Sequence, residues 1–299
     1  MKKIKPLFLL LILNTISYAQ GCSDAGICSV GNSFSNEIQE SKNGIELGSI
    51  FGKGEADVIS ISSYITYTRN FSERFSLSGK VTYSQASGEF GTRGQFGDAY
   101  AIGNYKFKKM TNKQWSSLFG FKFPFSSANL KINGYPIPLD YQASLGTFDA
   151  IVGITFNYKK WDFNSALQLP IINNNKNSYF KEYSGTDDFP STNLFERKPD
   201  VLFRSNYTLK TTNQKFTFRP NLLFIYHLGE DSYKNIFGNR ERISGSEGLT
   251  INGNLITSYS INSKSSIELS LATPFVVRTI RPDGLTRSIT AGFTYKRSF

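Results

Sequence analysis

Apolar and polar residues alternate along most of this chain, in segments of about ten residues. In the last of them, ITAGFTYKRSF, every second residue from Ile289 to Tyr295 is apolar and the residues between are small or polar. A period of two places alternate side chains on opposite faces of a β-strand. The pattern therefore predicts an all-β protein with twelve strands, over residues 44–52, 57–69, 74–84, 98–108, 114–125, 147–158, 161–171, 200–210, 215–228, 249–260, 265–275 and 286–299.

The connections between these strands alternate in length. Those after the even-numbered strands are short, as at 159–160 and 262–264. Those after the odd-numbered strands are longer and polar, except the brief first one at 53–56; they cover 85–97, 126–146, 172–199, 229–248 and 276–285. Short turns toward the periplasm and long loops outside are typical of a bacterial outer-membrane barrel. A soluble β-sandwich also alternates apolar and polar residues, but it has no reason to lengthen every second connection.

A membrane location would add a constraint on the sheet. In lipid every backbone polar group must be paired, so an open sheet edge cannot persist. We therefore expect an up-and-down, antiparallel transmembrane β-barrel over residues 44–299, whose last strand pairs with its first. Phe299 would then lie at the periplasmic interface, where a terminal aromatic residue is typical of chains recognised by the barrel-assembly machinery. That machinery and outer-membrane lipids are the expected partners.

The beginning of the chain has the order of an export signal. Lys2, Lys3 and Lys5 precede the apolar run LFLLLIL, and small residues follow, ending at Ala19. The run is too short for a membrane-spanning helix, which needs about 20 apolar residues, but it fits a secretory signal peptide over residues 1–19. We expect cleavage after Ala19 and localisation in the outer membrane of a Gram-negative bacterium.

Composition narrows the partners further. The formal net charge is +11, but the basic residues are scattered and an exported protein rarely meets nucleic acid, so anionic lipid head groups are the better partner.

The polar segment 20–43 is either a plug of the barrel lumen or an unstructured periplasmic tail. Cys22 and Cys28 lie within it, and in an oxidising compartment a disulfide is the simplest use for them, ahead of free or metal-binding thiols. No cluster of histidines accompanies them, so we expect no metal site.

Three segments in the middle of the chain resemble a known family. FGDAYAIGNYKF (96–107), WSSLFGFKFPF (115–125) and ASLGTFDAIVGITFNY (143–158) are similar to the outer-membrane channels named for the phenol-degradation (MetA) pathway, which are grouped with FadL-like channels for hydrophobic compounds. The matching motifs are Gly97-Asp98, the strand-ending Pro124, and Gly146 to Asp149. The family usually has Pro-Thr-Gly where this chain has Pro124-Phe125-Ser126, so the following loop differs. The resemblance implies passive uptake of hydrophobic or aromatic compounds.

Alternation also selects the residues expected to face the lumen. Apolar residues are among them, including Leu118, Ile102, Ile151 and Leu202. Either a pocket for a hydrophobic solute or packing around a plug would explain apolar residues at inward positions. We expect Asp98 and Lys122, on hairpin-paired strands, to form an ion pair. The candidate lumen-lining residues are Glu46, Lys80, Asp98, Lys106, Lys122, Asp149, Asp162, Arg204, Arg219, Leu223, Ile225, Glu268 and Lys296.

These observations favour an outer-membrane channel for passive uptake of small hydrophobic or aromatic compounds. The alternative is a structural or adhesive surface barrel whose long loops bind an extracellular partner. Catalysis is not expected, because the single histidine, His227, is followed by Leu228 rather than by a recognisable nucleophile motif, and the acidic doublet Asp187-Asp188 lies in a polar loop. No motif suggests a cofactor or energy coupling.

Overall fold

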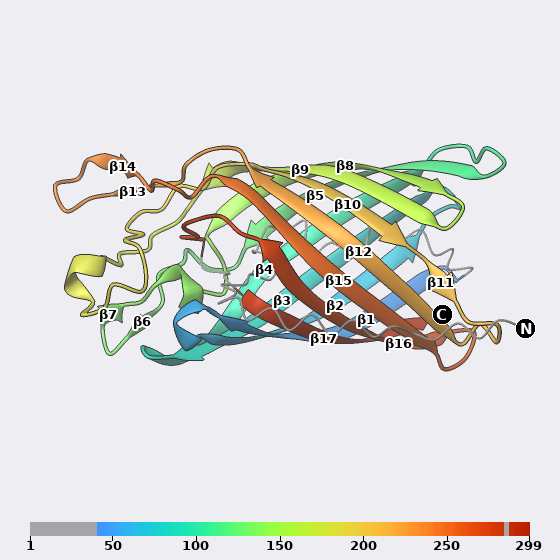
Figure 1. Ribbon diagram of the computed structural model, residues 1–299, viewed down its shortest axis with the longest axis horizontal. Helices are drawn as coiled ribbons and strands as arrows, with labels where there is room; N and C mark the ends of the chain where they lie inside the picture. Colours follow the sequence, from blue (N-terminus) through green and yellow to red (C-terminus); the bar gives the residue numbers. More distant parts are fainter. Residues whose placement is uncertain (1–40, 284–286) are drawn as a thin grey trace, which may run out of the picture.

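The chain forms a β-barrel with short turns at one end and long loops at the other (Figure 1). A computed structural model describes residues 41–283 and 287–299. The predictions for residues 1–19, for most of segment 20–43 and for Cys22 and Cys28 therefore lie outside the described residues. The spanning strands are β1 (Asn43–Gly54), β2 (Ile59–Asn70), β3 (Phe75–Gly88), β4 (Gly91–Lys106), β5 (Lys113–Pro124), β8 (Thr147–Tyr158), β9 (Trp161–Asn173), β10 (Asp200–Tyr207), β12 (Phe216–His227), β15 (Gly248–Ser260), β16 (Ser265–Val276) and β17 (Arg287–Ser298).

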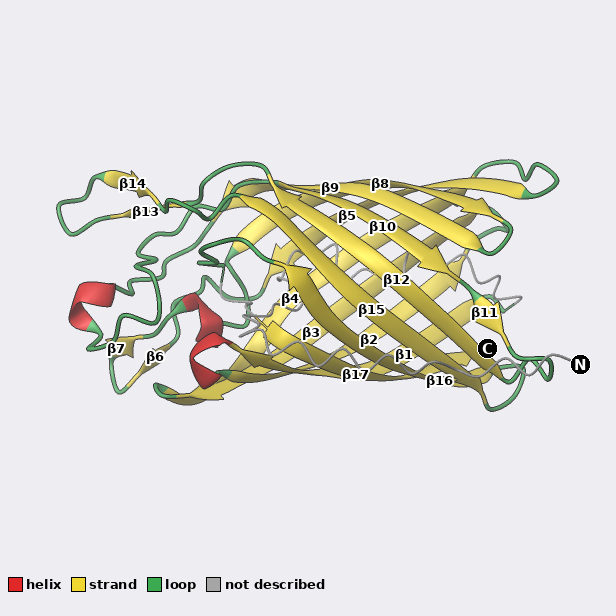
Figure 2. Cartoon of the chain, in the orientation of Figure 1, coloured by secondary structure: helices red, strands yellow, loops and turns green. Residues whose placement is uncertain are grey.

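These strands form one closed antiparallel sheet (Figure 2). Each strand pairs with its neighbours in chain order, and β1 pairs with β17 from Gly44–Ser298 to Gly54–Arg287. The ring also closes between β10 and β12, and the short β11 (Leu209–Lys210) continues β10 along the same neighbour. The predicted twelve-strand, up-and-down barrel is confirmed, as is the pairing of the last strand with the first. Closure satisfies the backbone groups that lipid cannot.

One predicted connection is wrong. Residues 85–97 were expected to form a long loop, but β3 and β4 continue to a tight hairpin in which Gly88 pairs with Gly91. A register shift between Val81 and Tyr83 interrupts the ladder beside Gly97-Asp98. At this bulge one extra residue shifts which residues of β4 face inward, so the apolar–polar alternation is interrupted. This interruption explains why residues 85–97 were not predicted to be part of a strand.

The outer face of the barrel is apolar, as a membrane requires. Val201 and Phe203 are 36% and 43% exposed, whereas Leu202 between them is fully buried. Phe119, Phe121 and the other large exposed apolar residues follow the same alternation around the wall. No helix within residues 41–283 and 287–299 is long and apolar enough to span a membrane.

The long loops pack together into a cap over one end of the barrel. They contain short elements: η2 (Glu55–Asp57), η3 (Leu139–Tyr141), η4 (Lys181–Tyr183), β6 (Lys131–Ile132), β7 (Tyr135–Pro136), β13 (Ser232–Lys234) and β14 (Arg240–Arg242). Tyr141, Tyr179 and Phe189 form one buried apolar cluster, and Leu139 and Phe195 belong to a second. Buried apolar contacts of this kind order a loop, so the cap is built as a small folded layer.

Candidate functional site: the barrel interior

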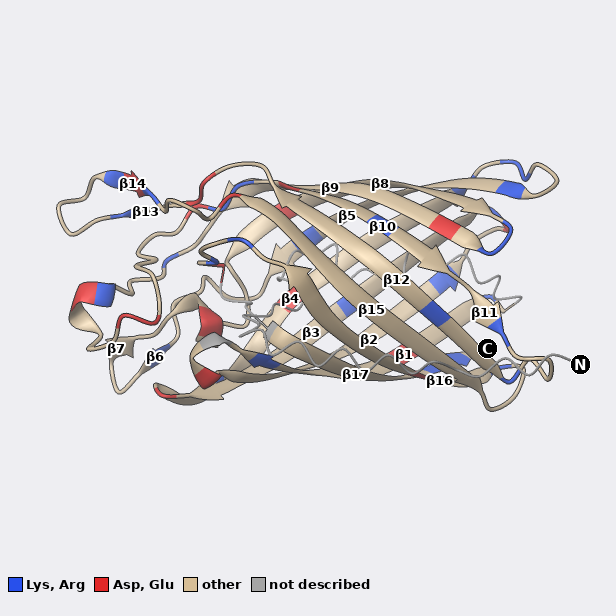
Figure 3. Ribbon diagram, viewed as in Figure 1, with Lys and Arg blue, Asp and Glu red and all other residues tan. Residues whose placement is uncertain are grey.

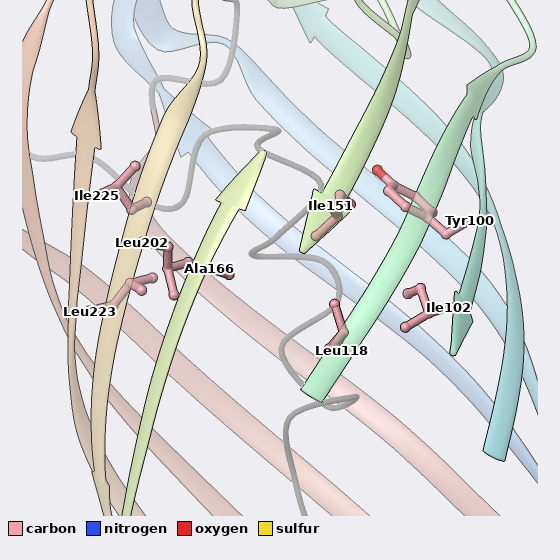
Figure 4. Packing of buried hydrophobic residues seen from close by; sticks show 8 residues of the cluster. All are labelled: Tyr100, Ile102, Leu118, Ile151, Ala166, Leu202, Leu223 and Ile225. Atoms are coloured by element: carbon pink, nitrogen blue, oxygen red, sulfur yellow. The ribbon is translucent and has the colours of Figure 1, made fainter. Parts of the chain in front are cut away.

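The inner face of the barrel divides into two contiguous halves. β4, β5, β8, β9, β10 and β12 form one half, and β15, β16, β17, β1, β2 and β3 form the other. On the first half, one apolar cluster crosses all six strands (Figure 4). It is composed of buried side chains only: Tyr100, Ile102, Leu118, Ile151, Ala166, Leu202, Leu223 and Ile225.

Strand register explains why these apolar side chains form a continuous band. Leu202 pairs with Ala166 on one side and with Ile225 on the other. Ile102 and Ile151 both face Gly120, which leaves room between them. Residues opposite each other on neighbouring strands place their side chains in contact on one face. The inward apolar residues of the sequence analysis therefore lie in one band on half of the wall, instead of around the whole lumen.

The second half of the inner face carries hydroxyl groups. Ser62 and Ser84 hydrogen-bond across β2 and β3 at 2.7 Å, and Thr68 and Ser78 do so at 2.8 Å. Tyr64 reaches across β1 to Thr294, with 2.7 Å between the hydroxyl oxygens. Side-chain hydroxyls that pair with one another stay satisfied and uncharged. This half therefore carries paired hydroxyls opposite the apolar band, together with charged residues such as Glu268 and Lys296.

A buried lysine stands at the cap end of the apolar band. The Lys122 ammonium lies 3.0 Å from Asp149 Oδ2, 3.0 Å from Thr147 Oγ1 and 3.8 Å from Asp98 Oδ2. The expected Asp98–Lys122 ion pair is present, but on a diagonal, because Lys122 pairs with Tyr100 and Asp98 with Pro124. Asp149 is the nearer partner, and sequence spacing could not reveal it because β8 follows a long loop.

The loop over residues 125–146 reaches down onto this cluster. Ser144 donates a hydrogen bond to Asp98 Oδ1 at 2.6 Å. A Cβ atom at Gly97 would stand 2.5 Å from the carbonyl oxygen of Ala143, so only glycine admits this close approach. Gly97, Asp98 and Asp149, which carry the family resemblance, therefore meet at the point where the cap contacts the barrel wall.

A second buried network joins the cap to β10 and β12. His227 Nδ1 lies 2.7 Å from Asp200 Oδ1, and His227 Nε2 lies 2.8 Å from Asp231 Oδ1. Ionised carboxylates only accept hydrogen bonds, so either both ring nitrogens carry protons or one carboxyl group does. Asp231 also accepts from the backbone N–H of Lys198 at 2.8 Å. Each ring nitrogen of His227 is thus within hydrogen-bond distance of an aspartate carboxyl group, and neither contacts a candidate nucleophile.

Arginines complete this network within the loops. Arg278 lies 2.9 Å from Asp283, and Arg197 lies 3.7 Å from Asp283 and also contacts Asp200. Burial disfavours the ionised form of Asp283, but Arg278 and Arg197 outweigh it and lower the pKa of that carboxyl to about 2. For Asp231, burial dominates and raises the pKa of the carboxyl. Three loops, which contain Arg197, Asp231 and Arg278 with Asp283, are therefore tied to the barrel by charge.

The remaining charged candidates lie nearer the short turns. Glu268 is buried 2.9 Å from Lys296 and 3.6 Å from Arg219. The Lys80 ammonium lies over the ring of Tyr64, 4.1 Å from its centroid. Among the other charged candidates, Arg204 is buried, whereas Glu46, Lys106 and Asp162 are half-buried. Asp162 accepts a hydrogen bond from Asn157. The charges thus occur as balanced clusters, and Leu223 and Ile225 lie between them in the apolar band.

Sequence reasoning missed the residues that order the cap. Asn173, Asn175 and Asn177 each accept a hydrogen bond from the backbone N–H two residues on. The Asn177 amide donates to the carbonyl oxygens of Ala128 and Ile137, joining two loops. Closely spaced asparagines favour such turns, so the run NNNKN was the available signal. Asp187, in the acidic doublet, is exposed and pairs with Lys181.

The described residues show no constellation suited to a metal. No group of three or more His, Cys, Asp or Glu side chains in residues 41–283 and 287–299 could hold an ion. His227 acts within an ion-pair network, as described above.

Comparison with solved structures identifies the fold. An outer membrane channel from Pseudomonas putida F1 is similar with a TM-score of 0.58 and 12% identity, covering 88% of this chain and 97% of that one. This is the fold of an outer-membrane channel. The NanC porin (TM-score 0.48, 10% identity, 85% and 98% coverage) and the CymD monoaromatic hydrocarbon channel (0.43, 8%, 95% of each chain) are more distant. No family model and no curated protein matches the sequence.

Proposed function

We propose that this protein is an outer-membrane channel for passive uptake of small hydrophobic or aromatic compounds. The carrying observation is the apolar band on one half of the inner wall. Apolar side chains on the inside of a barrel have no lipid to face, so a solute that prefers them to water explains their position. Ion-selective pores use rings of one sign, whereas inner charges of opposite sign pair with each other here, Lys122 with Asp149 at the cap end of the band and Glu268 with Arg219 and Lys296 nearer the short turns.

We also propose that the chain belongs to the channel family named for phenol degradation. The support lies in where the resembling segments fold. They form β4, β5 and β8, which are neighbours in the sheet. Their motif residues Asp98 and Asp149 both contact Lys122. Residues scattered over three segments thus serve one cluster, which is the arrangement expected of a shared functional feature.

The same proposal places the chain in a Gram-negative outer membrane after removal of residues 1–19. Assembly would proceed through the final strand and Phe299, and lipids would surround the apolar outer face. Residues 20–40 would carry the Cys22–Cys28 disulfide and either plug the lumen or extend from it. N-terminal sequencing and non-reducing mass spectrometry of the exported protein test the cleavage site and the disulfide together.

A liposome assay tests the channel itself. The mature protein is reconstituted, and entry of small sugars, amino acids, phenol-like aromatics and fatty acids is measured under matched gradients. Selective entry of the aromatic compounds or fatty acids is the expected result. Preferential entry of sugars, or entry of nothing by a folded barrel lacking residues 20–40, would contradict the proposal.

A surface-binding role is the second candidate, and exposed aromatic residues at the loop tips favour it. Phe237 is 81% exposed, Tyr135 75% and Tyr183 74%. Large apolar side chains in water at the tips of an ordered cap are suited to contact with a partner. Replacing all three with serine would abolish such binding and leave solute entry unchanged, which separates this role from the channel role.

A further inference from the structure

The short-turn end of the barrel carries charge of nearly one sign. Among the described residues of these turns, Glu73 is the single exposed acidic side chain. The cap end mixes both signs (Figure 3). A surface of this kind attracts anionic lipid head groups. The exposed basic residues of the short-turn end are Lys42, Arg69, Arg74, Lys108, Lys109, Lys113, Lys159, Lys160, Lys210, Lys215, Lys264 and Arg297.

A groove lies on the membrane-facing surface next to one part of this basic rim. It has a volume of about 710 Å³ and crosses β10, β12, β15 and β16. The side chains that line it are mostly apolar, and they include Trp161, Tyr207, Leu222, Leu255, Leu271 and Phe275. Because alternation points these side chains away from the lumen, the groove opens toward lipid.

A proline and two small residues leave the space for this groove: Pro220, Gly253 and Ser205. Pro220 has no amide hydrogen, and pairing between β10 and β12 stops at Asn206–Asn221 before β11 resumes it at Leu209–Phe218. Gly253 has no side chain, and the ring of Phe275 lies 2.5 Å from where its Cβ would stand. Ser205 adds only a hydroxymethyl group between larger neighbours.

Two exposed lysines adjoin the end of the groove that lies nearest the short turns. Trp161, which lines the groove, directly follows Lys159 and Lys160 in the chain. The backbone N–H of Thr208 donates to the Lys160 carbonyl oxygen at 2.8 Å, which holds the end of β10 against this turn. Lys210 is not part of this end of the groove, because its pairing with the inward-facing Thr217 places it on the lumen side of the rim.

We propose that this groove and these lysines form a binding site for one anionic phospholipid. An acyl chain lies along the groove between Tyr207 and Leu255, and the phosphate lies beside Lys159 and Lys160. Trp161 occupies the boundary, where an indole ring contacts both chain and head group. The charge of the rim selects this occupant over a zwitterionic lipid, because each nearby lysine strengthens binding of an anionic head group.

The two tryptophans of the chain allow a direct test. In a Trp115→Phe variant, Trp161 is the only indole, and lipids brominated on the acyl chains quench its fluorescence on contact. The variant is reconstituted in phosphatidylcholine vesicles that contain a small fraction of either brominated phosphatidylglycerol or brominated phosphatidylcholine. We expect markedly stronger quenching by the anionic lipid at equal fractions.

Matched variants separate the site from the rim as a whole. Replacing Lys159 and Lys160 with Gln should lower the preference for the anionic lipid by about fivefold for each lysine. The same replacement of Lys108 and Lys109 removes equal charge from another turn and should leave the preference unchanged. Ser205→Phe, which fills the groove, should lower quenching by the anionic lipid, whereas Ser117→Phe on the outer face of β5 should not.

Three results would overturn the proposal. The first is equal quenching by both brominated lipids, which would mean an ordinary boundary lipid. The second is an equal loss from both lysine pairs, which would assign the preference to the rim alone. The third is protection of Trp161 from both lipids together with dimers in analytical ultracentrifugation, which would assign the groove to a second copy of the chain.

Discussion

The two halves of the inner wall share one architecture and differ in chemistry. Each half has six antiparallel strands of similar length. The half from β4 to β12 carries the apolar band from Ile102 to Ile225, whereas the half from β15 to β3 carries paired hydroxyls such as Ser62–Ser84. Neither half needs these residues for barrel closure, which depends on the backbone. The difference therefore reflects what the interior contacts rather than how the barrel is held together.

Buried charge borders the apolar half at its cap edge. Lys122 with Asp98 and Asp149 lies there, and the His227 network extends the same row through Asp200. A second buried cluster, in which Glu268 contacts Lys296 and Arg219, lies nearer the short turns and mostly in the hydroxyl half. The apolar half is the surface to which we assign the solutes of the proposed function.

Removal of the lysine at the cap edge of the apolar half should have the largest effect. Lys122→Met leaves the Asp98 and Asp149 carboxylates buried without their cation. Loss of one partner from a buried ion pair costs about 3–5 kcal/mol, so the unfolding midpoint in denaturant should fall strongly. Lys108→Met, on an exposed turn, is the control. An unchanged midpoint would show that Lys122 does not hold the two carboxylates in the folded barrel.

A fall in pH should have the second-largest effect, a loss of stability in the cap. The pKa of Asp283 is lowered from 3.8 to about 2 by Arg278 and Arg197, against burial. Its stabilisation is complete above the unfolded pKa and is lost as pH falls from about 4 through about 2, amounting to about 2 kcal/mol at most. The hydrogen-exchange protection of residues 277–283, taken relative to the intrinsic amide exchange rate at each pH, should fall across this window.

The Asp283→Asn variant should exchange quickly at neutral pH and lose the acid dependence. Asp187→Asn removes an exposed carboxylate of the cap and serves as its control. Protection of residues 277–283 in the wild type that stays constant between pH 5 and about 2 would show that Asp283 does not stabilise the cap.

A substitution in the hydroxyl half should have the smallest effect. Thr68→Val removes one partner of the Thr68–Ser78 hydrogen bond while keeping the shape of the side chain. The expected loss is about 0.5–1.5 kcal/mol, measured as the unfolding midpoint beside the Lys122→Met variant. A loss as large as that of Lys122→Met would mean that both halves carry equal structural weight, against the contrast described above.

The strands and their closure were predictable because apolar and polar residues alternate with a period of two in segments such as 265–275 and 286–299. Alternation also indicated that Leu202 and Leu223 face inward, where the structure buries both. It could not show that they join Ile102 and Ile151 in one band, because register between distant strands is set by closure of the whole ring. The cap escaped prediction for a related reason: its order rests on contacts such as Asn177 to Ala128, which no local pattern encodes.

One measurement tests the central claim most directly. Entry of a phenol-like aromatic solute and of a small sugar is compared in liposomes with wild type, with Leu202→Asn plus Leu223→Asn, and with Ser62→Asn plus Thr68→Asn. The account predicts that the first pair slows the aromatic solute by about tenfold or more relative to the sugar. The second pair, in the hydroxyl half, should leave that ratio near the wild-type value. An equal effect of both pairs, or an unchanged ratio in both, would contradict the account.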